Sequence, residues 1–69
     1  MNPITPDQLN ALVGVARGRS VEAIAEASGE PVNTVASRLR TAMLKLEART
    51  YAQAVAEAFK AGIITKEML

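Results

Sequence analysis

Two helices joined by a tight turn are predicted in residues 20–46, which read SVEAIAEASGEPVNTVASRLRTAMLKL. Ser20 is a favourable N-cap for a short helix at about residues 20–28, and Glu22 in its first turn opposes the helix macrodipole. The run Ser28–Pro31 ends that helix, because it contains a glycine and a proline that cannot continue it. A short helix of about eight residues, a glycine-containing turn and a longer helix form the geometry of a helix-turn-helix.

The longer helix, predicted at about residues 32–48, has one apolar face and one polar face. Apolar residues recur at steps of three and four, which directs them to the core: Val32, Val35, Leu39, Ala42, Met43 and Leu46. The opposite face collects the polar residues Asn33, Thr34, Ser37 and Thr41, flanked by the cations Arg38, Arg40 and Lys45. Residues 32–49 hold four cations and one carboxylate, a local charge of +3 in a chain of net charge +1.

One further helix is predicted on each side of this pair. The first lies at about residues 6–17, where Thr5–Gln8 has the pattern of a capping box. The other lies at about residues 51–61, where Thr50–Gln53 repeats that pattern. A glycine follows each of them, as is common at helix C-termini. The sequence therefore predicts one all-α domain of four helices over residues 1–69.

The composition excludes several kinds of chemistry. The chain has no Cys and no His, so disulfides, thiolate zinc sites and His-based acid/base catalysis are not available to it. Its seven carboxylates are dispersed and it has no glycine-rich phosphate loop, so we expect no enzyme activity, no metal and no cofactor. No apolar run approaches the length of a membrane span, and no basic-then-apolar leader is present. We therefore expect a cytoplasmic protein without membrane contact.

Short segments spread over all the predicted helices form a recognisable set. They are Ile4-Thr5-Pro6, Gly18-Arg19-Ser20, Glu22-Ala23-Ile24-Ala25-Glu26, Thr34-Val35, Leu39-Arg40, Lys45-Leu46, Ala54-Val55-Ala56 and Gly62-Ile63-Ile64. From Ile4 to Ile64 the chain resembles the LuxR/GerE-type DNA-binding domain, a four-helix helix-turn-helix module of bacterial regulators that occasionally occurs alone. Residues 31–40 also resemble the helix-turn-helix of sigma factor region 4, but the fourth helix and its Gly-Ile-Ile ending favour the LuxR type.

This resemblance implies roles for the last two helices. The third would enter the major groove of double-stranded DNA, with contacts from Asn33, Thr34, Ser37, Arg38, Arg40, Thr41 and Lys45. Amide and hydroxyl side chains can reach base edges or phosphates, with Asn suited to adenine and Arg to guanine. The fourth helix would form a homodimer through its small and apolar residues Tyr51, Ala54, Val55 and Ala58.

Four residues depart from the pattern of the resembled family. Glu30 stands where an apolar turn residue is usual, and Ala36, Thr41 and Leu44 stand where basic residues are common. The leading hypothesis is a sequence-specific DNA-binding transcription regulator of a bacterium or phage. The alternative is a protein-interaction module that binds and modulates a regulator or another protein, which the small net charge and the apolar Leu44 favour.

Overall fold

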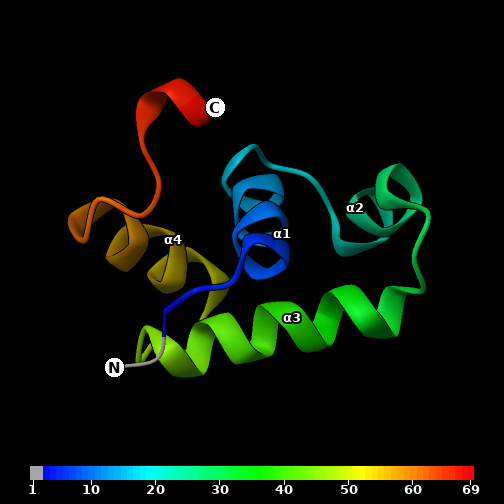
Figure 1. The fold of residues 1–69 in the computed structure, drawn as a ribbon, viewed down its shortest axis with the longest axis horizontal. Helices are drawn as coiled ribbons and strands as arrows, with labels where there is room; N and C mark the ends of the chain where they lie inside the picture. The colour runs from blue at the N-terminus through cyan, green and yellow to red at the C-terminus, as the bar shows by residue number, and fades with distance from the viewer. Residues whose placement is uncertain (1–2) are drawn as a thin grey trace.

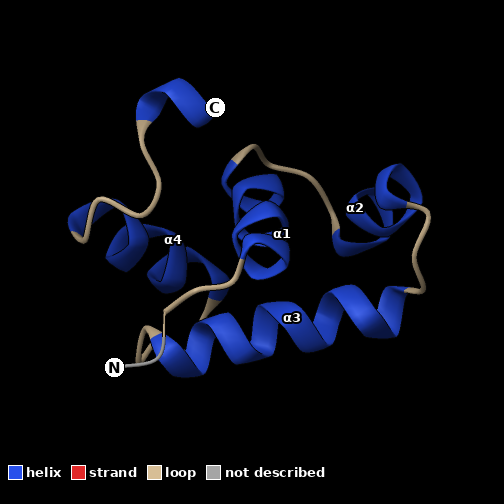
Figure 2. Ribbon diagram, in the orientation of Figure 1, coloured by secondary structure: helices blue, strands red, loops and turns tan. Residues whose placement is uncertain are grey.

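The chain folds into four α-helices and one short 3-10 helix in the computed structural model, which describes residues 3–69 (Figure 1). The elements are α1 Pro6–Ala16, α2 Val21–Ser28, α3 Val32–Lys45, α4 Tyr51–Lys60 and η1 Lys66–Met68. Within the described residues no strand occurs, so the all-α prediction is confirmed (Figure 2). No helix among them is both long enough and apolar enough to cross a membrane.

The helices begin at or next to the predicted residues because their caps are local. Thr5 and Gln8 form both hydrogen bonds of the capping box of α1. The capping box predicted for α4 is only half formed: Thr50 Oγ1 accepts a hydrogen bond from the Gln53 N–H at 3.0 Å. Gln53 Oε1 instead accepts a hydrogen bond from the backbone N–H of Arg49 at 2.8 Å. One hydroxyl cap is thus enough to fix the start of α4.

α3 ends at Lys45 and not near residue 48 as predicted. The Glu47 N–H donates to the Leu44 carbonyl at 3.2 Å, and the Ala48 N–H donates to the Met43 carbonyl at 2.9 Å. This is the hydrogen-bond pattern of a Schellman motif, with Glu47 in the left-handed position at φ 54°. This helix end could not be predicted from the sequence, because glutamate occupies a position at which glycine is usual.

Replacing Glu47 by glycine is expected to stabilise the fold by up to about 1 kcal/mol. Glycine has no Cβ to clash in the left-handed conformation, and this gain exceeds its larger entropy loss on folding. Urea unfolding followed by circular dichroism measures the difference. Glu26→Gly, at an exposed position inside α2, is the matched control and should lose about 1 kcal/mol. Equal destabilisation by both variants would contradict the assigned strain at Glu47.

The core lies where α1, α3 and α4 meet, with α2 packed mainly on α3 (Figure 1). Its buried apolar residues are Ala11, Leu12, Ile24, Ala25, Val35, Leu39, Ala42, Ala54, Ala58 and Ile64. Val32, which was predicted to point into the core, is 41% exposed. It lies in the first turn of α3, at the end of the helix remote from α4 (Figure 1). Met43 and Leu46 are half-buried at the border of the core.

The segment after α4 folds back toward the C-terminal end of α1 (Figure 1). Ile64 is buried in the core, and the Arg17 guanidinium donates to the Met68 carbonyl through Nε at 3.0 Å and Nη2 at 2.6 Å. This contact joins residues far apart in sequence. Arg17 therefore holds the last turn of the chain against the helical core.

Candidate nucleic-acid interface

One face of α3 lies open to solvent along its whole length. Asn33, Ser37, Arg40 and Leu44 are exposed, and their spacing of four, three and four residues places them on a single stripe. The stripe lies opposite the buried Val35 and Leu39. We call Asn33, Ser37, Arg40 and Leu44 the exposed stripe. It combines an amide, a hydroxyl, a guanidinium and one apolar side chain that is 73% exposed.

The two threonines predicted to contact DNA lie at the border of this face. Thr34 and Thr41 are both half-buried. The Thr41 hydroxyl donates to the Ser37 carbonyl on the preceding turn of α3 at 3.0 Å. Its proton is therefore used within the helix, although the oxygen can still accept a hydrogen bond. Neither threonine belongs to the exposed stripe.

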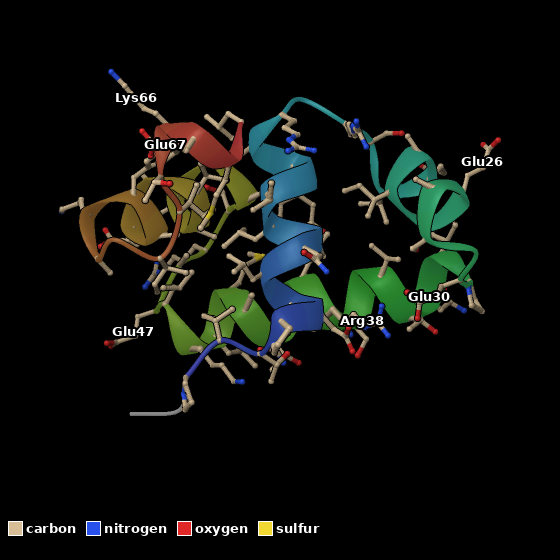
Figure 3. All side chains as sticks on the ribbon, turned by 45° about the horizontal axis from the view of Figure 1, so that its top comes forward. Glu26, Glu30, Arg38, Glu47, Lys66 and Glu67 are labelled. Carbon is tan, nitrogen blue, oxygen red and sulfur yellow. The ribbon has the colours of Figure 1, made fainter. Side chains whose placement is uncertain are left out.

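Arg38 is engaged by carboxylates of its own chain. Its Nη1 and Nη2 atoms donate to Oε1 and Oε2 of Glu30 at 2.5 and 2.6 Å, and Oδ2 of Asp7 lies 3.7 Å from Nη2. Figure 3 shows Glu30 and Arg38 directed toward one another, from the α2–α3 turn and from α3. Hydrogen bonds from Arg38 lower the pKa of Glu30, against the opposing effect of desolvation. Hydrogen bonding to Glu30 correspondingly raises the pKa of Arg38.

Lys45 is also engaged within the chain. Its Nζ atom donates to the Pro3 carbonyl and to Oε1 of Gln8, both at 2.8 Å. The same Gln8 oxygen accepts the Thr5 N–H in the capping box of α1. Lys45 therefore joins the C-terminal end of α3 to the start of α1.

The predicted cationic face is consequently divided into two parts. Arg40 lies on the exposed stripe and makes no ion pair within residues 3–69. Arg38 and Lys45 lie on the flank of α3 that faces the start of α1. The count of +3 along residues 32–49 therefore overstates the charge that the exposed stripe presents. The Glu30–Arg38 pair was missed because eight residues separate its members, and a turn of unknown geometry lies between them.

Two of the predicted dimer contacts occupy a different environment from the one expected. Ala54 and Ala58 are 0% exposed and pack in the core. A fully buried side chain has no surface for a second chain, so these two assignments are corrected. Val55 is half-buried and Tyr51 is 38% exposed. The outer face of α4 carries Ala52, Gln53, Ala56, Phe59 and Lys60, which are all exposed.

An open hollow of about 320 Å³ lies between α1 and α2. Its lining includes the apolar residues Gly14, Ile24 and Val35, and Glu30 and Arg38 also line it. Gly14 permits the close approach of the two helices here, because a Cβ at that position would lie 2.7 Å from Cγ1 of Ile24. The ion pair thus borders open space and not a packed wall.

Comparison with known protein families and with curated proteins finds no match to this chain. The resemblance to the LuxR/GerE-type domain therefore stays a prediction from the sequence.

Proposed function

We propose that this chain binds double-stranded DNA as a helix-turn-helix transcription regulator of the LuxR/GerE type, acting in the cytoplasm. The observation that supports this function best is the exposed stripe of α3, which follows directly on a tight turn from α2. Asn33, Ser37 and Arg40 offer the amide, hydroxyl and guanidinium groups that bind base edges in the major groove. The stripe is the surface that would enter the groove.

A homodimer would fit this function, because two copies of α3 could then contact half-sites about one helical turn apart. The outer face of α4 supports such an assembly, since Ala52 and Ala56 are small and Phe59 is 37% exposed. Small residues allow a close approach between two helices. Tyr51 and Val55 border this face and would extend the contact.

Binding of a fluorescent mixed-sequence duplex at several salt concentrations tests the proposal. Displacement of counterions from DNA makes the logarithm of the association constant fall linearly with the logarithm of salt, with a slope of about −0.9 for each phosphate neutralised. The proposal predicts that the association constant, measured by fluorescence anisotropy titrations, declines in this way as salt is added. An absence of binding at the lowest salt concentration, or an affinity that does not respond to salt, would contradict it.

The second candidate function is binding to a protein partner, and Leu44 favours it. This side chain is 73% exposed and lies in the exposed stripe, next in sequence to Lys45, whose Nζ atom is already hydrogen-bonded within the chain. An apolar side chain in this position suits contact with a protein better than contact with phosphate. In this function the chain would bind and modulate a regulator or another protein.

Leu44→Arg separates the two functions. If α3 lies on DNA, the added cation should reach the backbone and steepen the salt slope by about 0.9. If Leu44 packs against a partner protein, the charge should abolish that complex in size-exclusion chromatography. Leu44→Ala is the control without an added charge. The fold should persist in both variants because the side chain is exposed. If Leu44→Arg has the same salt slope as Leu44→Ala, this end of α3 does not lie in the DNA interface.

A further inference from the structure

The geometry of the Glu30–Arg38 pair resembles that of an arginine bound to phosphate. Two guanidinium nitrogens of Arg38 contact the two carboxylate oxygens of Glu30 at 2.5 and 2.6 Å. Arginine binds phosphate oxygens with the same paired donors, and its rigid fork makes carboxylate and phosphate direct alternatives. A carboxylate in this position therefore occupies the donors that a DNA phosphate would use.

The location of the pair leaves it accessible to an incoming phosphate. The side chains of Arg38 and Glu30 are 25% and 31% exposed, and both line the open hollow between α1 and α2. Glu30 lies in the turn immediately before Pro31, the N-cap residue of α3. Asp7 adds a second carboxylate at 3.7 Å, so the Arg38 charge is neutralised from two elements. No deeply buried ion has to be moved for exchange to occur.

We propose that Glu30 competes with DNA phosphate for Arg38 and thereby lowers the affinity of α3 for the DNA backbone. This inference rests on the proposed function in DNA binding. Backbone contacts carry no sequence information directly, whereas Asn33, Ser37 and Arg40 contact base edges in that function. By withholding one phosphate contact, Glu30 lowers the affinity about equally for all duplex sequences. Glu30 thus sets the strength of backbone binding and need not touch DNA itself.

The experiment measures nonspecific duplex binding against salt for Glu30→Gln, Arg38→Gln and the double variant. Glu30→Gln should steepen the slope by about 0.9. Between 1 M and 0.1 M salt, the affinity of this variant should therefore rise about eightfold more than that of wild type. Arg38→Gln should change the slope little in the wild-type background, but it should remove the whole gain in the Glu30→Gln background. This dependence on background identifies Arg38 as the group that Glu30 releases.

The matched control is Glu57→Gln. It makes the same change in net charge at a carboxylate that lies 3.8 Å from Lys60 on α4. A general charge effect would steepen the slope equally in Glu30→Gln and Glu57→Gln, and that result would overturn the inference. Thermal unfolding verifies that each variant is folded, and Glu30→Val serves as a second variant without the carboxylate. A purely structural pair would change the unfolding temperature and leave the salt slope unchanged, which also overturns the inference.

The outcomes for the two proposals are distinguishable. If wild type binds DNA and Glu30→Gln has the same slope as Glu57→Gln, the inference about Glu30 is wrong and the proposed function stands. If neither wild type nor any of the variants binds DNA, the proposed function itself is wrong and the inference falls with it. If only Glu30→Gln and Glu30→Val bind measurably, Glu30 blocks the Arg38 contact as inferred, but the proposed function of the wild-type chain is wrong.

Discussion

Ala58→Glu is expected to unfold the protein. Ala58 is 0% exposed among the core residues contributed by α1, α3 and α4. A carboxylate there would lose its hydration without gaining a partner, and its larger volume would also displace neighbouring side chains. The expected loss is about 4 kcal/mol or more. Small domains have a total stability of about 0.05–0.15 kcal/mol per residue, so a chain of this length has little reserve. Circular dichroism at 25 °C should show a loss of helix.

Ala56→Glu is the matched control, because Ala56 lies on the same helix but is exposed. This variant should keep the helical spectrum and unfold near the wild-type temperature. If the outer face of α4 forms a dimer, Ala56→Glu should also raise the dissociation constant measured by sedimentation. A folded Ala58→Glu protein with the wild-type unfolding temperature would show that α4 does not pack as described.

Arg40→Ala is expected to weaken DNA binding by about 5- to 150-fold, the range that corresponds to about 1–3 kcal/mol for a base-contacting arginine. Arg40 is exposed in the centre of the stripe and makes no ion pair within residues 3–69. Its removal should therefore leave the unfolding temperature unchanged. Competition between a specific duplex and a mixed-sequence duplex measures the loss.

Lys60→Ala provides the comparison for Arg40→Ala. It also removes one exposed cation, but from the last turn of α4, where the side chain is 75% exposed. Under the proposed function it should weaken binding far less than Arg40→Ala. Equal losses of DNA affinity in the two variants would indicate that binding depends only on the net charge of the protein and that α3 has no special role.

The beginnings of the helices could be predicted from sequence because the responsible interactions are local. The Thr5 cap and the Ser20 cap each bind an N–H three residues away. The central core residues Leu12 and Leu39 also follow from helical spacing. These features depend on periods of three and four residues, which a sequence displays directly.

The remaining features depend on neighbours that spacing alone cannot identify. Ala54 and Ala58 share a helix face, but the sequence does not say whether α1 or a second chain covers that face. The pairing of Arg38 with Glu30 requires the path of the α2–α3 turn. The left-handed Glu47 has no local signal, because glutamate rarely adopts that conformation. Packing between helices decides the first of these features, and the backbone path of a turn decides the other two.

The most direct test of the DNA-binding surface is a two-dimensional amide NMR titration of the wild-type protein with duplex DNA. The proposed function predicts that the largest shift changes occur at Asn33, Ser37 and Arg40, while the amides of Ala52 and Ala56 on α4 change little. Largest changes on the outer face of α4 with an unperturbed exposed stripe, or no changes at all, would contradict the assignment of α3 as the DNA-binding helix.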